Sequence, residues 1–121
     1  MADMAKYLLL IYGDEREWEG MSDQEQQRLI EGHRDLAAAA GSAILDTREL
    51  EPASVATTLR ADAAGKLTTT DGPFLETKEA VGGYYLIEAG DLDEVMGLAA
   101  RLYESSASHG GVEIRPVAEG E

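Results

Sequence analysis

The sequence contains no cysteine, and this absence excludes several kinds of site and cross-link. Thiolate nucleophiles, zinc sites built on thiolates and stabilising disulfides all require cysteine. The chain has 121 residues. A domain of this size buries roughly two-thirds of the surface that its unfolded chain exposes, which stabilises it without a disulfide or a metal. We therefore expect one domain spanning residues 1–121, with no structural metal and no cofactor.

Positive charge is scarce. Lys and Arg number 10 against 24 Asp and Glu, which gives a net charge of −14 at pH 7 and a pI of about 4.4. Such a surface repels phosphate backbones and anionic lipid headgroups, so we expect neither nucleic acid nor a membrane as a partner. The acidic residues between positions 14 and 25 lack the Asp/Asn alternation around a central Gly that forms a calcium loop, and we expect a solvated surface there.

Long hydrophobic runs and the short motifs of several enzyme classes are also absent. The longest apolar run covers residues 7–12, whereas a membrane-spanning helix needs about 20 residues. No cationic segment with a following cleavage site begins the chain, so we expect a cytoplasmic protein. The sequence has no His-x-x-x-His, Gly-x-Ser-x-Gly or Gly-x-x-x-x-Gly-Lys-Ser/Thr pattern, which excludes zinc hydrolases, α/β-hydrolases and P-loop proteins.

The first third of the chain predicts a strand, a loop and a helix. Residues 6–12 are almost all apolar, which is typical of a strand buried on both faces. Residues 14–20 are acidic and contain the only Trp, so a loop is expected there. Ser22 and Glu25 have the spacing of a capping box, and Gly41 is a suitable end for the helix that follows. Its predicted buried face comprises Leu29, Ile30, His33, Leu36, Ala37 and Ala40.

The middle of the chain predicts strands and a hairpin. Residues 43–50 favour a second strand. Residues 54–60 and 66–70 carry Thr and Val and are separated by a Gly-containing loop, as in a β-hairpin. The chain turns at Asp71-Gly72-Pro73, and a strand over residues 81–88 begins with paired glycines that indicate a bulge or a close backbone approach.

The last third predicts one more helix and one more strand. Asp91 is placed to cap the helix, whose expected buried face comprises Leu92, Val95, Met96, Ala99, Leu102 and Tyr103. Residues 112–117 alternate as a strand, and Pro116 favours an edge or a strand end. With the hairpin set aside, the order is βαββαβ, the ferredoxin-like α+β arrangement. The uncovered sheet face, to which we assign Tyr7 and Tyr85, predicts a homodimer joined through the sheets.

Three short segments carry a resemblance to a known family. Asp71-Gly72-Pro73-Phe74, Glu76-Thr77-Lys78-Glu79 and Gly82-Gly83-Tyr84-Tyr85 resemble the DGPF-domain proteins of the YCII-related superfamily. The resemblance implies a dimeric α/β barrel of ferredoxin-like subunits. Such proteins are often encoded near extracytoplasmic-function sigma factors, which suggests a regulatory link. Some relatives carry a His/Asp pair in a cleft. Here the candidates are His33 with Asp46 or Asp71, and spacing does not choose between the two carboxylates.

Histidine as a residue type titrates near neutrality, which suits a general acid or base. His33 also lies on a predicted apolar helix face, where a histidine with a structural hydrogen bond is expected more often. His109 is expected in a solvated loop. The predicted pocket combines the 71–78 turn with scarce cations that can bind an anion or pair with an acid, and its candidates are Asp71, Gly72, Pro73, Phe74, Glu76, Lys78, Arg48 and Arg115. The turn residues also have a purely structural explanation.

Three functions remain open from the sequence. The first is a small dimeric ligand-binding or accessory regulatory protein with a pocket between the first helix and residues 71–78. The second is a small enzyme that uses His33 with Asp46 or Asp71 for acid–base chemistry on an organic substrate. The third is a protein-interaction module, linked to a sigma factor, whose acidic surface masks a nucleic-acid site on its partner.

Overall fold

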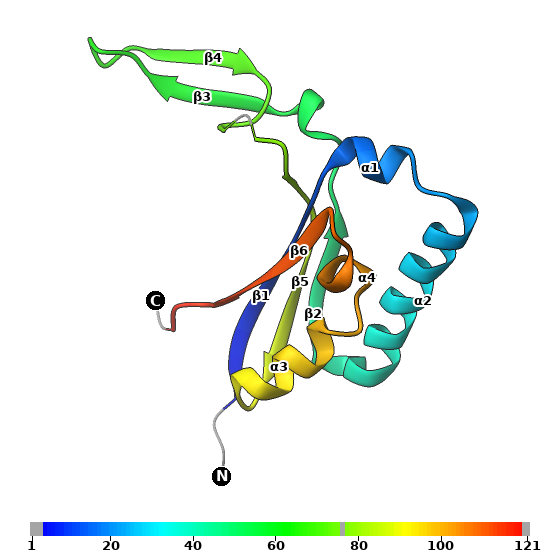
Figure 1. Cartoon of the computed structure of the whole chain (residues 1–121). Helices are drawn as coiled ribbons and strands as arrows, with labels where there is room; N and C mark the ends of the chain where they lie inside the picture. The colour runs from blue at the N-terminus through cyan, green and yellow to red at the C-terminus, as the bar shows by residue number, and fades with distance from the viewer. Residues whose placement is uncertain (1–3, 76, 120–121) are drawn as a thin grey trace.

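The structure, a computed structural model, describes residues 4–75 and 77–119 (Figure 1). Its centre is a four-stranded antiparallel sheet in the order β2-β5-β1-β6. The strands are β1 (Ala5–Gly13), β2 (Ile44–Glu49), β5 (Ala80–Ala89) and β6 (Gly110–Pro116). The longer helices are α2, between β1 and β2, and α3, between β5 and β6. The predicted α+β class and the βαββαβ order are therefore confirmed.

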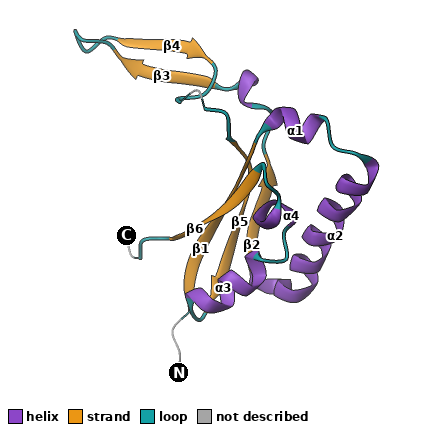
Figure 2. Ribbon diagram, in the orientation of Figure 1, coloured by secondary structure: helices purple, strands orange, loops and turns teal. Residues whose placement is uncertain are grey.

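Helices cover one face of this sheet (Figure 2). The longest is α2 (Asp23–Ala40), followed by α3 (Leu92–Ala99) and the single turn α4 (Tyr103–Ser106). Short 3₁₀ turns occur at Gly41–Ala43 and Ala53–Val55. No helix among residues 4–75 and 77–119 is both long enough and apolar enough to cross a membrane.

The ends of α2 follow from local chemistry that the sequence shows. The Ser22 hydroxyl accepts from the Glu25 backbone N–H at 3.2 Å, and the Glu25 carboxylate accepts from the Ser22 backbone N–H. Both free amides at the helix start are thereby satisfied, as the predicted capping box requires. Gly41 ends the helix with φ +54°, a left-handed value that glycine adopts without a steric penalty.

The core lies between the sheet and these helices. Its fully buried large side chains are Leu9, Leu36, Ile87, Val95 and Leu102, each from a different element or loop. Tyr7 and Tyr85 are also buried on this side, which corrects their assignment to the uncovered face. Residues of β1 alternate between buried and half-exposed, so within one chain the strand is buried on one face rather than on both.

Two helices differ from the sequence-based expectation. Residues 15–19 form the short helix α1 (Glu15–Glu19) and not a loop, because Asp14 caps it by accepting from the Arg16 backbone N–H at 2.9 Å. The helix after Asp91 ends at Ala99, four residues before Tyr103. The backbone N–H groups of Arg101 and Leu102 donate hydrogen bonds to the carbonyls three residues earlier, which tightens the turn after the helix. Leu102 then enters the core from the connecting loop.

The predicted buried faces are also only partly correct. In α2 the buried residues are Leu36 and Gly32, whereas Ile30 and Ala37 are exposed. A side chain on Gly32 would clash with the backbone of residues 101–103, so this glycine lets the α2 and α4 backbones approach closely. In α3, Val95 and Ala99 are buried and Leu92 and Met96 are exposed.

The paired glycines of β5 serve both purposes predicted for them. Ile11 faces Gly83 and Tyr12 faces Val81, so Gly82 is the extra residue of a bulge. A Cβ on Gly83 would lie 2.8 Å from the Arg48 carbonyl oxygen of the neighbouring strand. A Cβ on Gly82 would lie 2.6 Å from the Trp18 ring.

The predicted hairpin is present as a separate two-stranded sheet of β3 (Thr57–Ala61) and β4 (Leu67–Asp71). It projects away from the helix-covered sheet (Figure 1). The turn after it has Gly72 at φ +108°, as the Asp-Gly-Pro pattern predicts. Phe74 does not anchor this turn in a core: it is 63% exposed, and the Arg60 guanidinium lies 4.0 Å from its ring centroid.

Candidate functional site

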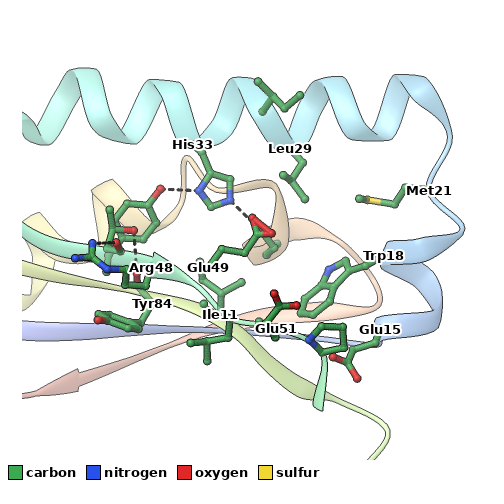
Figure 3. Close-up of a pocket in the computed structure, with 18 of the residues that line it drawn as sticks. Ile11, Glu15, Trp18, Met21, Leu29, His33, Arg48, Glu49, Glu51 and Tyr84 are labelled. Carbon is green, nitrogen blue, oxygen red and sulfur yellow. Dashed lines mark hydrogen bonds and ion pairs between the residues drawn. The ribbon is translucent and has the colours of Figure 1, made fainter. Parts of the chain in front are cut away.

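A cavity of about 920 Å³ opens between α2 and the sheet (Figure 3). His33 and Leu29 reach into it from α2, Ile11 lies on the sheet side, and Trp18 closes one end from α1. The cavity also touches β2, β5 and the loop after β2. Residues of β1, α1, α2, β2, β5 and α4 therefore build one concave site, which no single stretch of sequence contains.

Trp18 occupies its position because two glycines make room for the indole. A Cβ on Gly13 would lie 2.3 Å from the ring, and one on Gly82 would lie 2.6 Å from it. The indole thus packs directly on the backbone of β1 and β5. Glu15 fixes the start of α1 in the same region by accepting from the Ala53 backbone N–H at 2.9 Å. These contacts set the wall at this end of the cavity.

His33 lies between two polar side chains in the wall of the cavity. Its Nδ1 is 2.6 Å from the Tyr85 hydroxyl, and its Nε2 is 2.9 Å from Oε2 of Glu104. The His33 and Tyr85 rings are stacked, with centroids 5.7 Å apart. The Glu104 side chain is only 6% exposed, whereas His33 is 26% exposed. The three residues come from α2, β5 and α4 and form what we call the His33 cluster.

The proton positions in this cluster follow from its partners. Burial, together with the negative charge of Glu104, raises the pKa of Tyr85 above its ordinary value, so its hydroxyl keeps a proton at neutral pH. Tyr85 can then donate to Nδ1 of His33. The neutral imidazole that makes both contacts carries its proton on Nε2, from which it donates to Glu104.

Two residues that line the cavity each have a buried polar atom without a partner among the described residues. These atoms are Nε1 of Trp18, a donor, and Oε1 of Glu104, an acceptor. Buried polar atoms in folded proteins are nearly always hydrogen-bonded, because an unpaired one costs about 1–3 kcal/mol. An orphaned donor and an orphaned acceptor on two residues of the same lining are therefore the features of this site that most need a chemical explanation.

Carboxylates outnumber cations around the cavity. Its lining contains two arginines, Arg34 and Arg48. Arg48 already contacts Asp46, at 2.8 Å from Nη1 to Oδ1. The glutamates of the lining are Glu15, Glu19, Glu49, Glu51 and Glu104.

Asp46, one of the two carboxylates considered as a partner for His33, belongs to a different cluster. It accepts from the Tyr84 hydroxyl at 2.8 Å and contacts Arg48. The Tyr84 hydrogen bond, with the Arg48 charge, lowers the pKa of Asp46, and the same hydrogen bond raises the pKa of Tyr84. The carboxylate beside His33 is that of Glu104 and not that of Asp46 or Asp71.

Most residues of the predicted pocket lie elsewhere. Arg48 lines the cavity, whereas Asp71, Gly72, Pro73, Phe74 and Lys78 do not. Asp71 ends β4, in the hairpin that projects away from the helix-covered sheet (Figure 1). Glu76 lies outside the described residues. The described residues of the predicted turn, 71–75 and 77–78, are thus separate from the cavity.

The structure also places Arg115 and His109, the two other residues that the sequence analysis considered. Arg115 is on β6, pairs with Glu113 and does not line the cavity. His109 is not solvated as expected, since its side chain is 14% exposed. Its ring lies edge-on to Tyr103, and its Nε2 is 3.9 Å from Glu25. Among residues 4–75 and 77–119, no group of three or more His, Asp or Glu side chains is arranged to hold a metal ion.

Sequence reasoning found His33 and missed its partners. Glu104 is 71 positions from His33 and sits in a segment with no motif, and Tyr85 is 52 positions away. Tyr85 belongs to the Gly-Gly-Tyr-Tyr segment that carries the family resemblance, so this segment was the one available signal.

Comparisons with known proteins agree with that resemblance. The model of the YCII-related domain matches residues 5–120. An uncharacterised protein of Rhizobium meliloti (strain 1021) is 38% identical over 118 residues, which cover 93% of this chain and 91% of that protein. The match includes the strands, the helices and the hairpin alike, and on this ground the chain belongs to the YCII-related domain family.

Proposed function

We propose that this protein binds a small organic molecule in the cavity between α2 and the sheet. The volume of about 920 Å³ lies within the range of small-molecule sites. Apolar side chains such as Ile11, Leu29 and Trp18 form its walls, and the polar groups converge at the His33 cluster. Apolar walls with a few convergent polar groups are the usual composition of a ligand site.

The observation that carries this proposal is the pair of orphaned atoms, Nε1 of Trp18 and Oε1 of Glu104. After a small shift of the two side chains toward the cavity, a ligand that accepts from the indole and donates to the carboxylate would satisfy both. The free energy cost of leaving each atom unpaired, about 1–3 kcal/mol, would then be recovered on binding.

A direct test uses Trp18, the only tryptophan, as an internal reporter. A library of small organic molecules is screened for a rise in thermal midpoint and for a change in Trp18 emission, since a ligand stabilises the state it binds. We expect Ala37→Phe to abolish binding, because Ala37 lines the cavity and a phenyl ring there occupies it.

The matched control is Ala39→Phe on the same helix, since Ala39 is exposed and does not line the cavity. It should bind as the unmodified protein does. Ligands that bind the Ala37→Phe protein with unchanged affinity, or a library without a single ligand, would contradict the proposal.

A second candidate function is acid–base catalysis, and the His33 cluster favours it. A substrate proton that reaches Nδ1 of His33, directly or through the Tyr85 hydroxyl, would leave an imidazolium beside the buried Glu104 carboxylate. The negative charge would stabilise that imidazolium, as a carboxylate behind a catalytic histidine commonly does. Glu104 here has the role that sequence reasoning gave to Asp46 or Asp71.

This candidate is tested on the ligands found in the screen. Turnover should fall by about 10²-fold or more in His33→Ala, because general acid–base catalysis contributes about 10²–10⁴-fold. Tyr103→Phe removes a hydroxyl outside the cavity and should leave turnover unchanged. Full turnover in the His33→Ala protein would exclude this mechanism.

We further propose that two chains join through the uncovered sheet face to form the dimeric barrel that the resemblance implies. Leu8 and Leu10 of β1 and Leu86 of β5 alternate with the buried positions and are half-exposed in one chain. The ion pairs Asp46–Arg48 and Glu113–Arg115 lie on the two edge strands beside them. An apolar centre with a charged rim is the usual composition of a protein interface.

The oligomeric state tests the dimer. The thermal midpoint should rise with protein concentration, and Leu10→Glu should give a monomer by light scattering. Met96→Glu is the control, because Met96 is an exposed apolar residue on α3, on the other side of the sheet. A concentration-independent midpoint in a monomer would refute the barrel. The regulatory partner implied by the resemblance stays a prediction.

A further inference from the structure

We propose that the cavity takes an organic cation, with an apolar body against Ile11, Leu29 and Trp18 and an ammonium group hydrogen-bonded to Oε1 of Glu104. This rests on the proposed ligand-binding function and specifies the chemical class of the ligand. Three independent features of the site support it: the unpaired oxygen, the charge of the lining, and the apolar wall.

The first feature is the half-used carboxylate of Glu104. Its Oε2 accepts from His33, whereas its Oε1 is buried and has no partner among the described residues. A carboxylate can only accept hydrogen bonds, so the missing partner must be a donor. Oε1 has almost no solvent-accessible surface, so the carboxylate must turn slightly toward the cavity for a ligand there to reach this oxygen. An ammonium group supplies both the donor and a compensating charge, which makes charge-assisted hydrogen bonds roughly twice as strong as neutral ones.

The second feature is the charge of the lining. The lining contains five glutamates and two arginines, and the Arg48 side chain already forms an ion pair with Asp46. The net charge of the whole chain, −14, has the same sign. Clefts lined by charge of one sign concentrate counter-ions and repel ions of like sign. An anionic ligand would have to approach the negative charge of this lining, and a cation is drawn towards it.

The third feature is the apolar part of the lining. Ile11, Leu29 and Trp18 present hydrocarbon and indole surface to the cavity (Figure 3). Removing apolar ligand surface from water there contributes roughly 25 cal/mol per Å². A compact inorganic cation would leave this wall unused, whereas an aryl or alkyl amine uses both the wall and the carboxylate.

Three probes of nearly equal size separate charge from shape: 2-phenylethylamine, 2-phenylethanol and phenylacetate. Binding is followed by Trp18 emission and by calorimetry at neutral pH. We expect the amine to bind about tenfold more tightly than the alcohol, and phenylacetate to bind most weakly. Raising the salt concentration from about 20 mM to about 500 mM should weaken the binding of the amine and leave the binding of the alcohol unchanged, because salt screens only interactions between charges.

The decisive variant is Glu104→Gln, which keeps the shape of the side chain and an acceptor for His33 while removing the charge. The dissociation constant of 2-phenylethylamine should rise about tenfold and that of 2-phenylethanol should stay within about twofold. Glu17→Gln is the matched control, because it removes one negative charge from exposed α1 outside the lining and should change neither. If Glu104→Gln fails to fold by circular dichroism, the three-probe comparison and the salt series decide the question in the unmodified protein.

The outcomes separate this inference from the proposed function. Tighter binding of the alcohol or of phenylacetate, or an amine affinity that Glu104→Gln leaves unchanged, would overturn the cation and leave ligand binding in place. Library ligands that carry no cationic group would overturn it in the same way. Failure of every probe and every library molecule to bind would overturn the proposed function itself.

Discussion

The four-stranded sheet and the β3–β4 hairpin are both antiparallel, yet they differ in what covers them. The sheet has helices on one face and contains fully buried residues such as Leu9 and Ile87. In the hairpin, Thr58 is the one buried residue of the two strands. Both regions have a regular hydrogen-bonded ladder, so the difference lies in apolar burial. Because an isolated two-stranded hairpin is marginal in water, the ladder alone supplies little stability.

Hydrogen bonds of polar side chains also differ between the two regions: they join separate elements within the helix-covered body, whereas the hairpin is joined to its own flanking turn. In the body, Tyr103 donates to Glu25 at 2.9 Å and so joins α4 to α2, and Tyr84 joins β5 to Asp46 of β2. In the hairpin, Thr58 donates to the Gly72 carbonyl at 2.7 Å, which joins the hairpin to its own flanking turn. The body is therefore expected to unfold as one cooperative unit, and the hairpin to open locally at lower free energy.

The largest expected effect comes from truncating a leucine in each region. Leu9→Ala should lower the free energy of unfolding by about 2–5 kcal/mol, because Leu9 is fully buried. Leu59→Ala in β3 should change it by less than about 0.5 kcal/mol, because Leu59 is 60% exposed. Urea denaturation measures both. Comparable losses in the two variants would mean that another chain covers the hairpin in solution.

A second pair of substitutions tests how closely backbones approach within the body. Gly32→Ala should destabilise by about 1–3 kcal/mol, since its Cβ would lie 2.6 Å from the Arg101 carbonyl oxygen. Gly97→Ala in α3 has nothing within 4 Å and should stabilise by about 0.5–1 kcal/mol, because alanine favours a helix over glycine. Thermal unfolding measures both changes in stability and shows whether their signs are opposite. A stabilised Gly32→Ala protein would show that α2 can move away from α4.

A smaller effect is expected at the turn that follows the hairpin. Gly72 has φ +108°, so Gly72→Ala should cost about 1–2 kcal/mol although the space around it is open. Hydrogen exchange of the β3 and β4 amides should reveal this cost, while the urea midpoint of the body stays nearly unchanged. Gly111→Ala is the control, since its surroundings are also open and its φ is not positive. An equal shift in the body would show that the two regions unfold together.

The smallest expected effect is a pH dependence that belongs to the body. The Tyr103 hydrogen bond is the main cause that lowers the pKa of Glu25. A lowered folded-state pKa stabilises the fold above the ordinary pKa of the carboxyl, and this contribution is lost as the pH falls through the lowered value. Tyr103→Phe should therefore reduce the change in urea midpoint between about pH 5 and about pH 3.

The control for this pH series is Tyr12→Phe, because the Tyr12 hydroxyl has no hydrogen bond to the described residues. Its pH profile should follow that of the unmodified protein. If the pH profile of Tyr103→Phe also follows that of the unmodified protein, the hydrogen bond between Tyr103 and Glu25 does not contribute to acid sensitivity.

Much of the fold could be predicted because its signals are local. The Ser22–Glu25 capping box, the Asp91 cap and the Asp71-Gly72-Pro73 turn each act within four residues, and the structure confirms each of them. Prediction failed where a distant contact overrode a local pattern. The apolar periodicity of α3 continues to Tyr103, yet Leu102 leaves the helix because the core accommodates it from the loop.

The candidate site was much less predictable. His33 stood out because histidine titrates near neutrality, which is a property of the residue itself. Its partner Glu104 is one of many acidic residues, and nothing near it in sequence distinguishes it. The cavity was assigned to the 71–78 turn because that turn carries the family motif, yet this region lies on the hairpin side of the molecule.

By itself the sequence determined the α+β class, the order of the strands and of the two longer helices, the capped ends of α2 and the membership of the YCII-related domain family. These depend on interactions between neighbours in the chain or on motifs of a few residues. Only the tertiary structure decided that Glu104 and Tyr85 meet His33, and that Gly13 and Gly82 make room for Trp18. The physical reason is that packing α2 and α4 onto the sheet places side chains dozens of residues apart in one low-dielectric space, and this packing creates the cavity.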